Sequence, residues 1–234
     1  MPTPVGPLIP ACPTCRQPKA DAVDTLAANS GRASFATLQK FVRPQREASE
    51  VCELCSAPLS SQHQHLLELE KHRVTCACEA CSILFGGNAR QRFRRIPRDA
   101  YRLVNFTLDT AEWESLLIPI NLAFFVHSSS ANRVVAQYPS PGGAMESTLD
   151  LEYWNSVVVR NPILSSFEPD VEALLVNRLT AEPQYYRAPI DQCLHLVGII
   201  RTQWRGLSGG QEVWKHLDNF FVQLKQSSRE ELRA

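Results

Sequence analysis

The chain has 234 residues, of which 44% are hydrophobic and 21% are charged, and its 24 Lys and Arg residues balance its 24 Asp and Glu residues. This composition is typical of a globular protein and excludes a disordered or fibrous chain. The zero net charge argues against a protein whose whole surface binds nucleic acid or membranes.

The N-terminal sequence has neither the basic nor the apolar region of a signal peptide. The most apolar run, residues 116–126, is too short to cross a bilayer core of about 30 Å. We therefore expect a cytoplasmic protein without membrane insertion. In that compartment, eight cysteines indicate metal ligands and buried thiols rather than disulfides.

Residues 1–48 begin with five prolines among the first 13 residues and continue with an Ala/Ser-rich stretch, which predicts a flexible N-terminal tail. Cys12 and Cys15 form a C-x-x-C pair in this tail. With no other ligand nearby, the pair does not predict a self-contained site. A redox pair, a half-site completed by another chain and chance spacing remain open.

Residues 49–88 form a cysteine-rich module. Cys52-x-x-Cys55 is followed, after 22 residues, by Cys78-x-x-Cys81. Each C-x-x-C pair can span one edge of a metal tetrahedron, so the spacing predicts a four-cysteine zinc ribbon. Iron is the alternative, because thiolates suit both metals. A closed set of four cysteines indicates a structural rather than a catalytic ion.

Two antiparallel strands are predicted between the cysteine pairs, over residues 65–70 and 73–76. If the second strand continues to Cys78, Cys76 projects on the same face and lies close to the metal. Cys76 could then replace a ligand, contact one, or simply pack. His65 is a weaker candidate for a contact behind the ligands. Residues 82–85 predict a short helical turn ended by glycine.

Residues 89–228 predict an α+β domain of mixed sheet and helices. Strands are expected at 101–108, 120–126, 133–138 and 171–176, and a short helix capped by Asp109 or Thr110 carries Trp113. A helix is expected at 151–159, and two more at 191–204 and 211–225. The last of these has a strong amphipathic pattern.

The segment 90–102 is rich in arginine and includes Arg92, Arg94 and Arg95. Arginines beside aromatic residues can grip a phosphate backbone, so nucleic-acid binding is one hypothesis. The favoured interpretation is an exposed strand that faces the acidic part of this chain or an acidic partner. No Ser/His/Asp arrangement, histidine-rich triad or paired carboxylates stand out along the chain, and we therefore do not expect an enzyme.

Several stretches resemble a bacterial family of uncharacterised proteins, defined by a domain of unknown function. The resemblance covers residues 50–225 and is carried by Cys52-Glu53-Leu54-Cys55, His65-Leu66-Leu67, Cys76-Ala77-Cys78-Glu79-Ala80-Cys81, Pro169-Asp170-Val171, Trp204-Arg205-Gly206 and Gly209-Gly210-Gln211-Glu212-Val213-Trp214. Genes of this family tend to lie beside those of uptake nickel–iron hydrogenases and their maturation factors. The resemblance also includes Cys76 and His65 in the family pattern.

Three hypotheses follow from the sequence. The leading one is a non-catalytic zinc-ribbon accessory protein that binds a hydrogenase subunit or a maturation factor, as the resemblance implies. The second is an electron-transfer protein with iron in the same four cysteines. The third is a nucleic-acid-binding zinc-ribbon protein that uses the arginine-rich segment.

Overall fold

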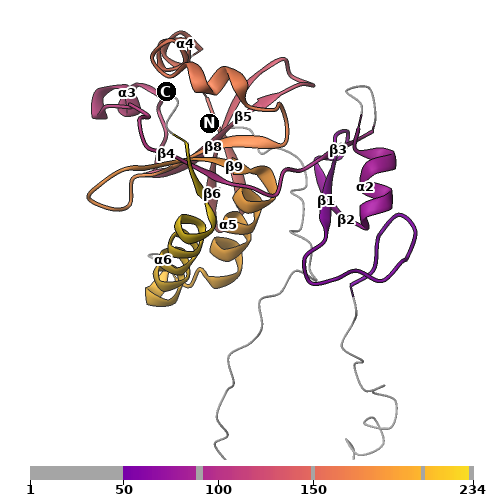
Figure 1. Cartoon of the computed structure of the whole chain (residues 1–234). Coiled ribbons are helices and arrows are strands. Elements are labelled where there is room, and N and C mark those ends of the chain that lie inside the picture. The colour runs from indigo at the N-terminus through magenta and orange to yellow at the C-terminus, as the bar shows by residue number, and fades with distance from the viewer. Residues whose placement is uncertain (1–49, 88–91, 149–150, 207–208, 232–234) are drawn as a thin grey trace, which may run out of the picture.

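The computed structural model describes residues 50–87, 92–148, 151–206 and 209–231. The fold is α+β, as the sequence predicts, and contains a small three-stranded sheet and a larger mixed sheet of seven strands. The small sheet and its helix lie beside one end of the large sheet (Figure 1). The residues of the predicted tail, including Cys12 and Cys15, lie outside the described part of the chain.

The small sheet is built on the predicted hairpin of the cysteine module. Strands β1 (Gln64–Glu68) and β2 (Arg73–Ala77) are antiparallel, and β3 (Phe93–Arg95) adds to the other edge of β1, giving the order β2-β1-β3. Helix α2 (Glu79–Phe85) begins at the second cysteine pair and ends at Gly86. We call residues 50–87 and 92–95 together the ribbon.

The large sheet has the strand order β10-β4-β9-β8-β5-β6-β7, and its neighbours are antiparallel except for the parallel pair β10 and β4. Its strands are β4 (Tyr101–Leu103), β5 (Leu122–Ser128), β6 (Arg133–Ser140), β7 (Gly143–Ser147), β8 (Glu172–Asn177), β9 (Gln184–Pro189) and β10 (Arg229–Glu231).

Helices cover both faces of this sheet: α3 and α4 lie over one face, and α5 and α6 over the other (Figure 1). The bounds are α3 (Thr110–Ser115), α4 (Leu151–Arg160), the 3-10 turn η1 (Pro162–Ser166), α5 (Ile190–Gln203) and α6 (Gly210–Ser227). Asp109 caps α3 through a capping box with Glu112, as its sequence position predicts.

Strand alternation divides the core into two layers. On β5, Phe124 packs with the layer beneath α5 and α6, whereas Phe125 packs with Trp113 and Trp154 beneath α3 and α4. The Phe125 ring stacks on that of Trp154, with centroids 4.8 Å apart. The central strand β8 is buried along its whole length because both faces of the sheet are covered.

The ribbon packs against the large domain. Leu67 and Val74 of the ribbon belong to the same hydrophobic cluster as the residues of α5 and α6. Arg94 of β3 donates to the Asp170 carboxylate at 2.6 Å and to the Pro169 carbonyl at 2.7 Å. Asp170 lies two residues before the central strand β8, so this ion pair attaches the ribbon to the large sheet.

Some elements differ from the sequence prediction. The strand expected over residues 101–108 is only three residues long, because the chain turns away after Leu103 to reach the α3 cap. Strands β7, β9 and β10 lie where the sequence predicts no strand. No helix in the described part of the chain is long and apolar enough to pass through a membrane.

Candidate metal centre

The sulfur atoms of Cys52, Cys55, Cys78 and Cys81 come together and all lie within 4.8 Å of one another. The Sγ atoms of Cys55 and Cys78, one from each C-x-x-C pair, are 3.7 Å apart. In a tetrahedron with Zn–S bonds of about 2.3 Å, the sulfur–sulfur edge is about 3.8 Å. The four cysteines are therefore placed to hold one metal ion, as the sequence predicts.

Two different local structures present the cysteine pairs. The first pair sits in a turn that is closed by hydrogen bonds from the Cys52 amide to the Ala57 carbonyl and from the Ser56 amide to the Cys52 carbonyl. Ser56 has a φ of 61°, in the left-handed region, which lets the chain reverse after Cys55. In the second pair, Cys78 is the N-cap of α2, and its sulfur accepts from the Cys81 amide at 3.5 Å.

Glu53 fastens the first cysteine turn to strand β2. Its amide donates to the Cys76 carbonyl at 3.0 Å, and its carboxylate accepts from the Cys76 amide at 2.8 Å. Arg73 donates to the same carboxylate at 3.0 Å. Sequence reasoning did not identify Glu53 as a site residue, because its partner on β2 lies 23 positions away and the spacing of the cysteines does not reveal it.

The electrostatics of the four thiols favour a cation. Burial would raise the pKa of Cys52, but the amides of Cys78, Leu54 and Cys55 lower it to about 6. Burial and the three neighbouring cysteines raise the pKa of Cys81 to about 12. Several thiolates so close together repel one another, and a bound metal ion removes this repulsion.

Burial differs among the four ligands. Cys52 and Cys81 are buried, Cys78 is half-buried and Cys55 is exposed. The buried pair packs with Leu66 and Ala77 in a small cluster of its own. An ion held here would have one side close to solvent, and the four sulfurs would leave no position for a substrate.

Cys76 and His65 face away from this small cluster. They are direct cross-strand partners on β2 and β1, and alternation places them on the hairpin face opposite Leu66 and Ala77. Strand β2 ends at Ala77, so the alternation does not continue to Cys78. Cys76 and His65 instead form a group with His63, which the sequence analysis did not single out. A role for them at the four-cysteine site stays a prediction.

The three arginines of the arginine-rich segment contact acceptors of their own chain. Arg92 binds Glu68, Arg94 binds Asp170, and Arg95 binds Gln64 and Glu79. The partner of Arg94 belongs to the large domain, and the Arg94 side chain is only 13% exposed rather than on an exposed strand. A role of these arginines in binding another molecule stays a prediction. Cys193 is fully buried in α5, and this burial raises its pKa.

A scan against known families finds one match, which spans residues 51–228 and so includes the ribbon, the large sheet and both C-terminal helices. Neither the curated proteins nor the solved structures contain a significant match. The matched family has no assigned activity. The chain therefore belongs to the family of unknown function called DUF5947.

Proposed function

We propose that this chain is a non-catalytic accessory protein of the cytoplasm. In this proposal a zinc ion bound by Cys52, Cys55, Cys78 and Cys81 holds the ribbon in shape, and the ribbon binds a nickel–iron hydrogenase subunit or its maturation machinery. The observation that carries the proposal is the closed four-sulfur cage, which offers an ion structural ligands and no open position.

The outer end of α2 supports a protein-binding role. Ile83, Leu84 and Phe85 are consecutive apolar residues that are 62%, 67% and 43% exposed. Isolated exposed apolar residues are ordinary, but three together on a seven-residue helix form a surface that a partner can cover. Because Cys78 caps the start of α2 and Cys81 lies within the helix, the metal would fix the orientation of this surface.

The class of partner rests on the resemblance to proteins whose genes lie beside hydrogenase genes. Affinity purification of the full chain from cells that make the hydrogenase tests it. We expect a hydrogenase subunit or maturation factor to co-purify, and the variant Ile83→Ser/Leu84→Ser to lose most of it. The variant Val159→Ser is the matched control, because Val159 is an exposed apolar residue on a different helix, α4. Absence of any such component, or equal retention by both variants, would contradict the partner assignment.

Electron transfer is a second candidate, which the exposure of Cys55 favours. Iron in a four-cysteine cage is redox-active, and a ligand at the surface shortens the path to an electron donor or acceptor. The colour of the purified protein separates the two candidates. A colourless protein with zinc supports the accessory role, and a red or brown protein that bleaches on reduction supports electron transfer.

A further inference from the structure

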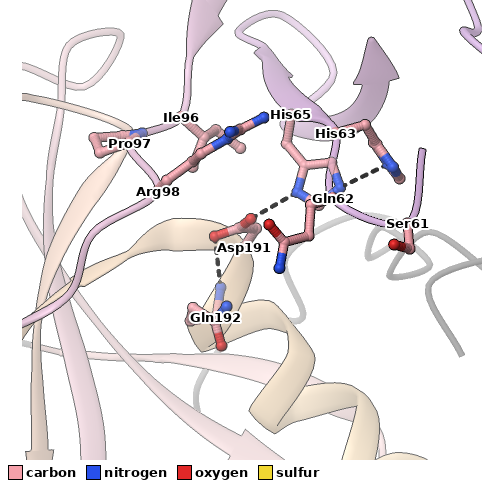
Figure 2. A pocket seen from close by; sticks show the side chains of 9 residues that line it. All are labelled: Ser61, Gln62, His63, His65, Ile96, Pro97, Arg98, Asp191 and Gln192. Carbon is pink, nitrogen blue, oxygen red and sulfur yellow. Dashed lines mark hydrogen bonds and ion pairs between the residues drawn. The ribbon is translucent and has the colours of Figure 1, made fainter. Parts of the chain in front are cut away.

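A second group of metal-ligand types lies on the other face of the β1–β2 hairpin, where the ribbon meets the large domain. It consists of His63, His65 and Cys76, whose ligand atoms all lie within 4.8 Å of one another. Cys76 is 2% exposed, and the His63 side chain is 4% exposed. Figure 2 shows the two imidazole rings turned toward each other at the edge of a cavity.

Both imidazoles direct their Nδ1 atoms at oxygen acceptors. His65 Nδ1 is 2.7 Å from Asp191 Oδ2 (Figure 2). His63 Nδ1 is 3.0 Å from the Ser60 carbonyl and 3.2 Å from the Glu50 carboxylate. These carbonyl and carboxylate oxygens accept hydrogen bonds, so a neutral ring that donates from Nδ1 presents the lone pair of its Nε2.

The two Nε2 atoms face each other at 3.2 Å. Two neutral rings in this tautomer turn their Nε2 lone pairs toward each other, and a cation between the two nitrogens, either a metal ion or a shared proton, relieves the repulsion. A tetrahedral ion with Zn–N bonds of about 2.0–2.1 Å has a nitrogen–nitrogen edge of about 3.3 Å. The spacing therefore fits two ligands of one ion, with the Cys76 sulfur as a third.

Asp191 supplies the support that ligand histidines usually have. It lies in the first turn of α5, and its Oδ1 accepts from the Gln192 amide at 2.8 Å. Its other oxygen is thereby held toward His65, 126 positions away in the sequence. A carboxylate that accepts from the non-ligating nitrogen fixes the ring and makes the other nitrogen a better ligand.

We propose that His63, His65 and Cys76 bind a second metal ion, a late first-row divalent ion such as Zn²⁺, with an exchangeable fourth ligand. Imidazole and thiolate donors select such ions over Mg²⁺ and Ca²⁺. Both histidines line an open cavity of about 390 Å³, whose wall also includes Gln62, Arg98 and Asp191. The three protein ligands leave the fourth position for water or a small anion that enters through this cavity.

This site is independent of the proposed function. It uses none of the four cysteines of the first cage, and an accessory protein with a purely structural first ion could carry it. The two sites also differ in character, because the first is closed by four protein ligands and the second has three.

The test is the number of Zn²⁺ ions bound by the full chain. Equilibrium dialysis against buffered free Zn²⁺, followed by elemental analysis, should give two ions per chain for the wild type. The variants His63→Gln and His65→Gln should each give one, because an amide keeps the polarity of the side chain but is a poor zinc ligand. The variant His216→Gln is the matched control, since His216 is exposed on α6 and should leave two.

Substitution with Co²⁺ shows which site is lost. The visible absorption of the four-thiolate site should persist in His65→Gln, which also shows that the ribbon is folded. The additional visible absorption of Co²⁺ at the mixed imidazole–thiolate site should disappear in the same variant. One ion per chain in the wild type at saturating Zn²⁺ would overturn the proposal and leave the two rings bridged by a proton. Two ions in both histidine variants would overturn it equally.

Discussion

Glu68 is the most completely buried carboxylate of the ribbon, with a side-chain exposure of 0%. Arg92 and Arg73 donate to it, at 2.7 Å and 3.4 Å for their Nε atoms, and Lys71 lies at 3.0 Å. Burial would raise the pKa of Glu68, but the hydrogen bonds and charges of Arg92 and Lys71 outweigh it and lower the pKa to about 2. Glu68 therefore joins the turn of the β1–β2 hairpin to the start of β3.

We expect Glu68→Gln to lower the free energy of unfolding by about 1–3 kcal/mol at pH 7, because the buried side chain loses its charged hydrogen bonds. Because the pKa of Glu68 is lower in the folded than in the unfolded protein, the ionised carboxylate stabilises the fold at pH values above the unfolded pKa. This stabilisation is lost as the pH falls toward the folded pKa. The difference between wild type and variant should therefore shrink from about pH 5 to about pH 2. Denaturant unfolding across this range measures it.

Glu70→Gln is the control for this experiment, since Glu70 is exposed two residues away. It should leave the pH dependence of stability as it is in the wild type. A Glu68→Gln variant with wild-type stability at pH 7 would contradict the role given to this carboxylate.

At the level of single residues, the sequence predicts the first metal site well and the second group poorly. The C-x-x-C spacing is local and dictates the tetrahedral arrangement with little help from the rest of the fold. The second group depends on cross-strand register, which pairs His65 with Cys76, and on Asp191 of a distant helix. Neither the register nor the approach of α5 can be read from the spacing of these residues.

At the level of elements, the ribbon has little core of its own. Its outer cluster has four buried residues, Cys52, Leu66, Ala77 and Cys81, and two of these are metal ligands. Apolar burial of this extent cannot offset the entropy of ordering the two cysteine turns and α2, so the metal must supply much of the stability. The hairpin has additional support, because Leu67 and Val74 pack on the large domain.

Removal of the metal by a strong chelator should therefore unfold the ribbon in part. We expect amide hydrogen exchange to accelerate at least roughly tenfold in the first cysteine turn and in α2, and less in β1. Amides of the buried strand β8 are the internal control and should keep their protection. Unchanged exchange in α2, or equal loss in α2 and β8, would contradict a metal that acts on the ribbon alone.

The elements that the sequence predicts correctly have a strong local signal. The hairpin of β1 and β2, the capped helix α3 and the amphipathic helix α6 each show their own periodicity or cap. Strand β9 escaped prediction because it mixes Arg187 and Gln184 with apolar residues and ends at Pro189, although it lies beside β8 in the sheet. Strand β10 has three residues, all polar or charged, and exists only through its pairing with β4.

At the level of the whole molecule, the Arg94–Asp170 pair holds the ribbon on the large sheet. The two side chains are 13% and 5% exposed, and Asp170 also accepts from the Ser129 amide and hydroxyl. Asp170 has a φ of 67°, so its backbone is fixed in the left-handed region as well. Without Arg94, the buried Asp170 carboxylate would keep hydrogen bonds only from the Ser129 amide and hydroxyl, among the residues that the structure describes.

Arg94→Ala should lower the free energy of unfolding by about 3 kcal/mol, because it breaks a buried ion pair on one side. Arg95→Ala is the matched control in the same strand. Arg95 and its partner Glu79 are 44% and 58% exposed, and exposed pairs contribute about 1 kcal/mol or less. Chemical denaturation of both variants measures the difference, and equal effects would argue against a buried connection between ribbon and sheet.

The metal content of the full chain with the second site removed tests the central claim most directly. In the variant His63→Gln/His65→Gln, elemental analysis should find one zinc ion per chain, and the protein should be colourless. Adding Cys52→Ser and Cys81→Ser should remove that ion, because both sulfurs belong to the four-cysteine cage. Iron with visible colour in the first variant, or zinc that survives the loss of both cysteines, would contradict a structural zinc ion at this site.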